Sequence, residues 1–401
     1  MDNQQTRSAS LNDQLDELLS ESVEAARARE GSTFDDLTAD GGGAFVLFGA
    51  GGLGRKTASG MRDLGMEVIA FADNNPQLWG TSLEGVPVMS AEEAGRQYGR
   101  SAAFVTTIWS GSSSGRQVDR VRQLRDLGCR TVVPFGYLYW KHPEVFLPHW
   151  SLNLPHRILE HADDLRALWS LWGDEDSQRE YLSQLRFRLW LDYDALRPPA
   201  PHLQYFADDL FSLSDQEVLI DCGAYDGDTI REFTERRGSN FAAIRAYEPD
   251  EANFSRLQEF LSQLDTSIRR KVTVRKFAVG AEFGSVGFVS EGSIASRVDT
   301  DSTVQVACVP LDGDLADIRP TYIKMDVEGS EMDALRGAAK TIHASRPILA
   351  ICVYHKPEDL REVPLFIKST SDGYRYFLRS HDEEGWELVC YAVPSDRLVR
   401  R

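Results

Sequence analysis

The sequence predicts an α/β protein with two parallel-sheet domains joined by a helical connector. Two observations carry this prediction. A short apolar run leads into a glycine-containing turn and then a helix at residues 44–64, and again from residue 218 to about residue 229. Such continuous apolar runs are typical of strands buried on both faces of a parallel sheet. The next predicted strand ends in an acid in both cases, Asp73 and Glu248, where open α/β sheets hold the ribose of a nucleotide.

Composition narrows the class of protein. The chain has 401 residues, which suits two or three domains, and 42% of them are hydrophobic. The formal net charge of −18 argues against nucleic acid or an anionic membrane as main partner, because both favour basic surfaces. The five cysteines are scattered without a C-x-x-C pair, so we expect buried, reduced thiols rather than disulfides or zinc. Without a signal-like N-terminus or a long apolar run, we expect a cytoplasmic protein.

Residues 1–40 are predicted to form one acidic amphipathic helix. Its apolar positions recur at helical spacing and are Leu11, Leu15, Leu18, Leu19 and Val23. Ser10 is placed to cap the helix. We expect this helix to pack on a neighbouring domain or subunit, and the glycine-rich residues 40–43 to end the segment.

Residues 41–136 are predicted to form a small Rossmann-like domain. Gly49, Gly51 and Gly54 form a G-x-G-x-x-G pattern between strand 44–48 and a helix, and strand 67–72 ends in Asp73. Further strands are expected at 103–108 and 130–134, with a helix at 117–127. The runs F-G-A-G-G-L-G-R, F-A-D-N-N-P-Q-L-W-G and L-E-G-V-P-V-M-S resemble nucleotide-binding domains of sugar-modifying and polysaccharide-pathway enzymes. The three glycines and Asp73 are therefore a tentative second nucleotide site, for NAD or a nucleotide-sugar. A scaffold that keeps the turn without a ligand is the alternative.

Residues 137–211 are predicted to form an aromatic-rich helical connector. Helices are expected at 157–171 and 176–190, and the proline-rich run 197–201 ends them. The tryptophans of this segment are expected mainly in the core, with stacking on a substrate as the alternative.

Residues 212–401 are predicted to form the second α/β domain. Buried strands are expected at 218–220, 243–247, 272–277, 321–325 and 347–353, with helices between them. Residues 374–379 and 386–393 alternate in polarity and indicate a terminal antiparallel hairpin.

The first turn of this domain indicates a cationic nucleoside ligand. Asp221-x-Gly223-x-x-x-Gly227 lacks the spacing that brings a pyrophosphate to a helix, and the carboxylates of Asp226 and Asp228 repel phosphate. S-adenosylmethionine fits, because it has a ribose, an ammonium and a sulfonium but no phosphate. Glu248 is expected to accept hydrogen bonds from the ribose. The predicted cofactor-binding residues are Asp221, Gly223, Ala224, Tyr225, Asp226, Gly227, Asp228 and Glu248, with Ala278 and Val279 against the adenine.

Four sequence blocks of residues 212–401 carry a family resemblance. They read V-L-I-D-C-G-A-Y-D-G-D-T, A-Y-E-P-D-E-A-N-F, V-P-L-D and Y-I-K-M-D-V-E-G-S-E-M-D-A-L-R-G-A. They resemble the FkbM family of S-adenosylmethionine-dependent methyltransferases, and residues 323–331 are the most specific part. The resemblance implies a class I methyltransferase domain, which is Rossmann-like, and methyl transfer, usually to a hydroxyl on a natural product or sugar.

Catalytic candidates lie where strands of this domain end. A hydroxyl acceptor must lose its proton to a base or a metal as the methyl group arrives. Asp326 and Glu328 follow one strand and His355 follows the next; an imidazole titrates near neutral pH and suits a general base. Lys324 is expected to pair with these acids or to contact the acceptor. Capping and structural hydrogen bonding are the alternatives for these residues.

Three neighbouring residues complete the set of candidates. Glu331 is expected mainly to cap the following helix, and His381 is a weaker candidate on the substrate side. A divalent metal held by the three acids 326, 328 and 331 beside Asp312 is possible, but we favour a site without metal.

We therefore expect an S-adenosylmethionine-dependent O-methyltransferase that acts on a small molecule or a sugar, without nucleic acid or membrane partners. One alternative is an NAD- or nucleotide-sugar-dependent sugar-modifying enzyme centred on the N-terminal glycine loop. The other is a non-catalytic two-domain binding protein. The acceptor pocket is expected to be built from the insertion 284–308, the helical connector and part of the N-terminal Rossmann-like domain, and a homo-oligomer is compatible with the sequence.

Overall fold

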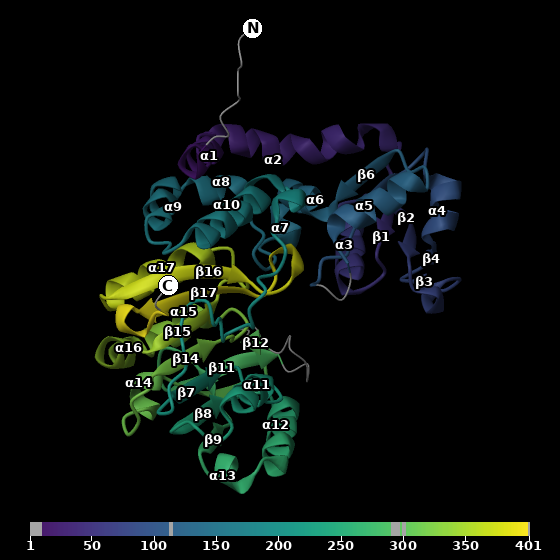
Figure 1. Cartoon of the computed structure of the whole chain (residues 1–401). Coiled ribbons are helices and arrows are strands. Elements are labelled where there is room, and N and C mark those ends of the chain that lie inside the picture. Colours follow the sequence, from purple (N-terminus) through teal and green to yellow (C-terminus); the bar gives the residue numbers. More distant parts are fainter. Residues whose placement is uncertain (1–9, 112–114, 290–296, 299–301, 400–401) are drawn as a thin grey trace. The chain divides into compact units, whose positions relative to one another are not determined.

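Two large sheets organise the chain (Figure 1). The computed structural model describes residues 10–111, 115–289, 297–298 and 302–399. The chain divides into two units, each built from separate segments. Unit 1 consists of Met1–Arg166, Gln178–Pro199 and Asp382–Trp386, and unit 2 of Ala167–Ser177, Ala200–His381 and Glu387–Arg401. The connector segment therefore contributes to both units.

The N-terminal segment holds two helices where one was predicted. Helix α1 covers Leu11–Leu18 and α2 covers Val23–Thr38. Ser10 caps α1, as expected, by accepting a hydrogen bond from the backbone of Asp13. Ser22 starts the second helix in the same way, by accepting from Ala25. A serine oxygen that binds the backbone three residues ahead favours a new helix start over a continuous helix.

The sheet of unit 1 has the order β3-β4-β2-β1-β5-β6. Only β3 is antiparallel to its neighbour. The strands are β1 (Ala44–Phe48), β2 (Glu67–Asp73), β3 (Ser82–Leu83), β4 (Val86–Ser90), β5 (Ala103–Thr106) and β6 (Thr131–Pro134), and the helices between them are α3 (Gly52–Asp63), α4 (Ala91–Tyr98) and α5 (Gln117–Asp126). Phe45 and Leu47 belong to one apolar core and Val46 and Phe48 to another. Because neighbouring strand residues point to opposite faces, both faces of this sheet are buried.

The segment after β6 is helical. Its helices are α6 (Phe135–Lys141), α7 (Pro143–Phe146), α8 (Pro155–Leu159), α9 (Ala162–Trp169) and α10 (Glu175–Trp190). The single helix predicted at 157–171 is therefore two helices, α8 and α9. Trp140 and Trp172 are buried, as expected for core residues, whereas Trp190 is exposed.

Five residues from the far end of the chain, Asp382–Trp386, complete unit 1. The buried carboxylate of Glu384 lies 3.4 Å from the guanidinium of Arg120 and accepts a hydrogen bond from the backbone of Gln117. Trp386 packs on Trp109 with 5.1 Å between ring centroids. These residues connect two strands of unit 2, which cover Tyr374–Ser380 and Leu388–Pro394. The strands of this hairpin therefore belong to unit 2, and its connection belongs to unit 1.

The sheet of unit 2 has the order β16-β17-β15-β14-β7-β8-β9. Its strands are β7 (Val218–Cys222), β8 (Ala243–Tyr247), β9 (Val272–Arg275), β14 (Tyr322–Met325), β15 (Ile348–Cys352), β16 (Tyr374–Ser380) and β17 (Leu388–Pro394). The first five are parallel, and β17 runs antiparallel between β15 and β16. The predicted class I methyltransferase arrangement, a parallel sheet finished by an antiparallel hairpin, is confirmed. The strand order reverses between β7 and β14, where such sheets bind ligands.

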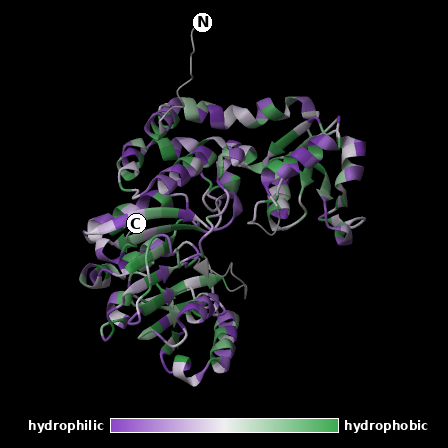
Figure 2. Cartoon of the chain, in the orientation of Figure 1, coloured by the Kyte–Doolittle hydropathy of each residue, from purple (hydrophilic) through white to green (hydrophobic). Residues whose placement is uncertain are grey.

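The helices of unit 2 follow the strands. They are α11 (Asp228–Arg237), α12 (Glu251–Gln263), α13 (Thr266–Arg269), α14 (Leu311–Asp314), α15 (Glu331–Arg336), α16 (Ala339–Ser345) and α17 (Asp359–Thr370). Figure 2 shows mostly apolar residues in the strands, whereas apolar and polar residues alternate along the helices. No helix in the described part of the chain is both long enough and apolar enough to cross a membrane.

A small third sheet follows β9. It consists of β10 (Ala278–Val279), β11 (Gly284–Val289), β12 (Arg297–Val298) and β13 (Gln305–Val309), in the order β10-β13-β11-β12. The insertion expected to contribute to an acceptor pocket falls on these strands, and its residues 290–296 and 299–301 lie outside the described residues.

Candidate functional site

The carboxyl ends of the parallel strands of unit 2 open into one cavity, called the site cavity here. Its wall includes Gly223 after β7, Glu248 after β8, Asp326 after β14 and Tyr354 after β15. The switch in strand order and the cavity therefore coincide.

The glycine turn after β7 forms one side of the cavity. Gly223 has a φ of +79°, and a Cβ at this position would lie 1.8 Å from the carbonyl oxygen of Asp326. Only glycine fits there, because the turn is packed directly against the end of β14. The next residues hold the turn onto β8, since the backbone N–H groups of Gly223 and Ala224 both donate to Tyr247 O at 3.0 Å.

Glu248 is a buried carboxylate on the same side. Its Oε2 accepts a hydrogen bond from the backbone of Tyr225 at 2.9 Å, and its Oε1 accepts from Asp250 at 2.9 Å. Burial raises the pKa of Glu248 to about 7, although these backbone hydrogen bonds oppose the shift. The acid is therefore fixed in orientation, and it lines the cavity.

The structure divides the predicted cofactor-binding residues into two groups. Those that line the cavity are Gly223, Tyr225, Asp228, Glu248, Ala278 and Val279. Those that do not are Asp221, Ala224, Asp226 and Gly227. Asp221 is fully buried below the turn, with Oδ1 3.2 Å from Lys324 Nζ. Ala224 is also fully buried. Gly227 packs so closely on Phe260 that a Cβ would lie 2.5 Å from its ring. Asp226 lies in a separate surface groove.

Lys324 is a buried cation in the wall of the cavity. Its Nζ donates a hydrogen bond to Gly223 O at 2.6 Å in addition to the Asp221 ion pair. Burial lowers the pKa of Lys324, but the carboxylates of Asp221 and Asp326 outweigh burial and raise it. The lysine therefore joins the glycine turn to β14 as a permanent positive charge.

Asp326 and Glu328 face the cavity from the turn after β14. Asp326 Oδ2 accepts a hydrogen bond from the hydroxyl of Tyr205 at 2.8 Å, and Oδ1 lies 3.4 Å from His355 Nε2. Glu328 Oε2 lies 3.6 Å from the same nitrogen. Burial alone would raise the pKa of Asp326, but Lys324 and His355 outweigh it and lower the value. Asp326 is therefore an ionised carboxylate with one oxygen held by a phenol.

His355 lies behind these acids and does not line the cavity. Its Nδ1 is 2.8 Å from Glu331 Oε1. Burial lowers the pKa of His355, but the carboxylates of Glu331, Glu328 and Asp326 outweigh burial and raise it to about 10. A protonated imidazole has no lone pair for a substrate proton. The expected general-base role near neutral pH therefore does not suit this geometry.

Two further predictions about this group need correction. Asp312 does not join the acids at the end of β14. Its carboxylate accepts hydrogen bonds from the backbone of Lys340 and Thr341 and so caps α16. Glu331 does contact the turn before its helix, by accepting from Val327 N at 3.0 Å, but it also binds His355.

Sequence reasoning missed a second group of cavity residues. Gln204, Tyr205, Tyr354 and Glu387 all line the cavity. The side-chain amide of Gln204 donates to Tyr205 Oη at 2.9 Å and to Glu387. The backbones of Tyr205, Tyr225, Glu328 and Glu387 are left-handed, with φ between 46° and 65°. Non-glycine residues in this conformation are strained and concentrate at functional sites.

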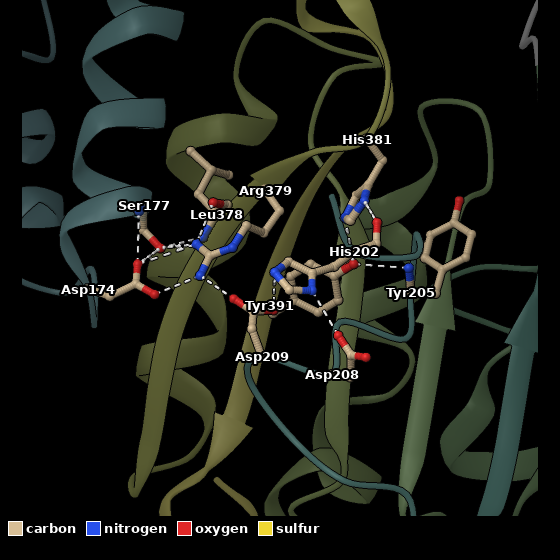
Figure 3. A network of polar contacts seen from close by, with 10 residues as sticks. All are labelled: Asp174, Ser177, His202, Tyr205, Asp208, Asp209, Leu378, Arg379, His381 and Tyr391. Carbon is tan, nitrogen blue, oxygen red and sulfur yellow. Dashed lines mark hydrogen bonds and ion pairs between the residues drawn. The ribbon is translucent and has the colours of Figure 1, made fainter. Parts of the chain in front are cut away.

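A buried polar network holds Tyr205 in place (Figure 3). Its backbone N–H donates to the hydroxyl of Tyr391 at 2.9 Å, and its carbonyl accepts from the hydroxyl of Tyr322. The Tyr391 hydroxyl lies 2.8 Å from His381 Nε2, and His381 Nδ1 lies 3.2 Å from the carbonyl of His202. Both ring nitrogens of His381 are thus engaged in this network, and the residue does not line the cavity. His381 supports Tyr205 instead of facing a substrate.

Comparison with known proteins bears directly on this part of the chain. Residues 221–376 match the methyltransferase FkbM domain. This match confirms the family resemblance for the part of unit 2 that builds most of the site cavity, and it indicates a methyltransferase. Gln204, Tyr205 and Glu387 lie outside the matched FkbM domain, although they line the same cavity.

Solved structures also resemble the chain. Methyltransferase FkbM from Methylobacillus flagellatus KT is 24% identical, with a TM-score of 0.75 over 96% of this chain and 100% of that chain, and shares its fold. A putative rRNA-methylase from Clostridium thermocellum is 12% identical, with a TM-score of 0.30 over 46% of this chain and 89% of that chain. The Rex-family repressor RSP is 18% identical, with a TM-score of 0.20 over 28% of this chain and 64% of that chain. No curated protein sequence matches the chain.

The glycine turn of unit 1 repeats one feature of the FkbM domain. Asp73 Oδ2 accepts a hydrogen bond from Ala50 N at 2.7 Å, and Oδ1 accepts from Asn75 N at 2.7 Å. Glu248, after β8, accepts two equivalent hydrogen bonds, from the backbone N–H groups of Tyr225 and Asp250. Gly49 has a φ of +118°, Gly51 faces open space, and a Cβ at Gly54 would lie 1.9 Å from Gly49 O. A nucleotide at Gly49, Gly51, Gly54 and Asp73 stays a prediction.

Proposed function

We propose that the protein is an S-adenosylmethionine-dependent O-methyltransferase that acts on a hydroxyl of a small molecule or sugar. One observation carries the proposal. The site cavity of the FkbM domain joins a nucleoside-type wall, with Gly223 and Glu248, to an acidic wall with Asp326, Glu328 and Glu387. A methyl donor and a hydroxyl acceptor must meet in one enclosed space for in-line transfer.

The nucleoside-type wall fits S-adenosylmethionine. Glu248 can accept hydrogen bonds from ribose hydroxyls with its remaining lone pairs. Ala278 and Val279 offer a small apolar surface for a flat base. Carboxylates of the wall, such as Asp228, suit a ligand with an ammonium and a sulfonium and oppose one with phosphates. When bound, S-adenosylmethionine supplies an electrophilic methyl carbon.

The acidic wall supplies the groups for the acceptor. Asp326 is held through Oδ2 by Tyr205, and its Oδ1 has no hydrogen-bond partner among the described residues. The carboxylate of Asp326 lines the cavity, where it can orient an acceptor hydroxyl. The hydroxyl proton leaves as the methyl group arrives, and Asp326, Glu328 and Glu387 are the carboxylates of the wall that can receive it.

Thermal unfolding with several ligands tests the proposal. S-adenosylhomocysteine at 100 times its dissociation constant should add about 2.7 kcal/mol of stability. The shift should disappear in Glu248→Ala and persist in Asp73→Ala, the matched variant in unit 1. A shift only with NAD or a nucleotide-sugar, lost in Asp73→Ala, would instead support the sugar-modifying alternative. The absence of a shift with both S-adenosylmethionine and S-adenosylhomocysteine would contradict the proposed methyl transfer.

A further inference from the structure

Three carboxylates line the acidic wall of the site cavity, those of Asp326, Glu328 and Glu387. His355, the base expected from the sequence, is protonated behind them. An efficient general base is unprotonated near the working pH and still binds a proton well. The surroundings of the three acids differ, and the difference selects one of them for this role.

Asp326 is stabilised as an anion. Its Oδ1 lies 3.4 Å from His355 Nε2, and Oδ2 accepts a hydrogen bond from the hydroxyl of Tyr205 at 2.8 Å. Burial raises the pKa of Asp326, but Lys324 and His355 outweigh it and lower the value. A carboxylate that neighbouring cations stabilise is a weak base. Asp326 therefore suits the orientation of a hydroxyl better than the removal of its proton.

Glu328 has the opposite defect. Burial raises its pKa to about 8, and the carboxylate of Asp326 adds to this shift, although His355 opposes it. Near neutral pH, Glu328 is therefore mostly protonated. A protonated carboxyl group can donate a hydrogen bond but cannot take a second proton.

Glu387 is held by neutral donors. The side-chain amide of Gln204 donates to Oε2, and the hydroxyl of Tyr354 also bonds to this carboxylate. An oxygen of Glu387 lies within 4.8 Å of one of Asp326. Burial and the Asp326 carboxylate raise the pKa of Glu387 to about 7. Glu387 is thus available as an anion near neutral pH and is a stronger base than Asp326.

Gln204 joins Glu387 to Asp326 through a chain of hydrogen bonds. Besides its bond to Glu387, the Gln204 amide donates to Tyr205 Oη at 2.9 Å, and the Tyr205 hydroxyl donates to Asp326. The amide nitrogen has two hydrogens, so it can make both bonds at once. The chain fixes the two carboxylates relative to each other on one wall of the cavity.

The titratable groups that surround Glu387 come from several elements of unit 2. They are Tyr205, Asp326, Glu328, Cys352, Tyr354 and His355. Burial raises the pKa of both phenols and of the Cys352 thiol, so these three groups are neutral at physiological pH. Asp326 is then the ionised acid next to Glu387, and His355 is the cation of the group.

On the basis of the proposed methyl transfer, we propose that Glu387 is the catalytic base, that Asp326 orients the acceptor hydroxyl, and that Gln204 is a positioning residue for both. The hydroxyl oxygen forms a bond to the methyl carbon as the bond from that carbon to sulfur breaks, with its electron pair going to sulfur. The hydroxyl proton moves to the Glu387 carboxylate. The products are a methyl ether, S-adenosylhomocysteine and protonated Glu387, which then releases its proton to water.

Infrared spectra of the full-length protein at a series of pH values test the assignment without an acceptor. The carboxyl absorption that appears as pH falls through about 7 should lose the contribution of one residue in Glu387→Gln. Asp326→Asn should lower the midpoint of that contribution by about one pH unit, because a neighbouring negative charge is removed. Gln204→Leu should raise it by about one pH unit, because a hydrogen bond to the ionised form is lost. Glu282→Gln, an exposed acid of the same unit, should match the wild type.

Kinetics supply the second test. For any hydroxyl compound that the wild type methylates, Glu387→Gln should lower kcat by about 100- to 10,000-fold and leave KM for S-adenosylmethionine nearly unchanged. An unaltered carboxyl absorption in Glu387→Gln, or a kcat within about tenfold of the wild type, would overturn the assignment.

Two controls complete the experiment. Circular dichroism establishes that each variant is folded, and the opposite shifts in Asp326→Asn and Gln204→Leu still test the assignment if Glu387→Gln does not fold. The thermal shift with S-adenosylhomocysteine should persist in Glu387→Gln, because Glu387 belongs to the acidic wall. Loss of that shift in the wild type would contradict the proposed methyl transfer, whereas a Glu387 that does not titrate near neutral pH would contradict only the choice of base.

Discussion

The hydroxyl of Tyr205 donates a hydrogen bond to Asp326 Oδ2 at 2.8 Å. This bond joins a residue that precedes the matched FkbM domain to a residue inside it. The backbone of Tyr205 is left-handed, with a φ of +65°, and its N–H and C=O are held by the hydroxyls of Tyr391 and Tyr322. Tyr205 therefore sets the position of the Asp326 carboxylate.

Tyr205→Phe should destabilise the protein by about 1.5–3 kcal/mol, because a hydrogen bond to a charged group is lost. The matched control is Tyr374→Phe, whose hydroxyl donates to the neutral carbonyl of Pro347 at 2.8 Å. That variant should lose only about 1 kcal/mol. Urea denaturation of both variants measures the difference. Equal losses in the two variants would show that the Tyr205 bond is not to an ionised carboxylate.

Gly223→Ala should prevent stable folding of unit 2 or lower its stability by several kcal/mol, on the order of the largest single-residue effects. The new Cβ would lie 1.8 Å from Asp326 O, and φ is positive as well. Gly238→Ala separates these two causes, since Gly238 has a φ of +55° but open space around its Cβ position. With a ψ of −125°, this position should lose about 1–3 kcal/mol from the backbone conformation alone. Thermal unfolding compares the two; similar losses would mean that the close packing of the turn on β14 is absent.

The affinity for S-adenosylhomocysteine should fall as pH falls through about 7. Burial raises the pKa of Glu248 to about 7, so the free protein loses the ionised acceptor for ribose hydroxyls below that pH. For one group of this pKa, the loss between pH 8 and pH 6 is about tenfold. Isothermal titration calorimetry across this range measures it. The same raised pKa means that this group's contribution to folding stability decreases as pH rises from its ordinary pKa of 4.5 to about 7.

Two variants check that Glu248 is responsible. Glu248→Gln should bind more weakly at pH 8 and show no pH dependence from this group. Glu235→Gln, an exposed acid on α11, should behave like the wild type. A pH dependence that persists in Glu248→Gln would assign the effect to another residue.

Lys324→Met should destabilise the protein by about 3–5 kcal/mol, because it leaves the Asp221 carboxylate buried without a counter-charge. Asp221 and Lys324 are both fully or nearly fully buried, 3.2 Å apart. The double variant Asp221→Asn/Lys324→Met should lose much less than the sum of the two single variants, and a double-mutant cycle in urea measures this. As a control, Arg336→Met breaks an exposed pair with Asp333 and should cost at most about 1 kcal/mol. Additive losses for the buried pair would exclude the strong coupling.

Local patterns in the sequence predicted the sheets well. Apolar runs such as Ala44–Phe48 and Ala243–Tyr247 are strands with the predicted bounds, because burial on both faces leaves a continuous apolar signal. Helix breaks were harder to predict. The division of the N-terminal helix at Ser22 and the separation of α8 from α9 depend on caps and short turns that interrupt a continuing apolar pattern.

The chemistry of the site was predictable only where it lies at strand ends. Glu248, Asp326 and Glu328 follow strands, so sheet topology places them in one cavity. Gln204, Tyr205 and Glu387 come from a loop and a hairpin that carry no local signal, and only tertiary packing brings them to the cavity. The position of His355 after a strand was predictable. Its hydrogen bond to the carboxylate of Glu331 was not, because an acid in the first turn of a helix is common and does not by itself indicate a histidine partner.

The segments of the two units alternate along the chain, and this order has a consequence for biosynthesis. A ribosome adds residues from the N-terminus, and domains generally begin to fold as they emerge. Unit 1 takes its last five residues, Asp382–Trp386, from a position after most of unit 2. Until those residues emerge, Arg120 has no Glu384 carboxylate and Trp109 has no Trp386 to pack on. The N-terminal unit, although synthesised first, therefore reaches its final state only after nearly all of its neighbour has been made.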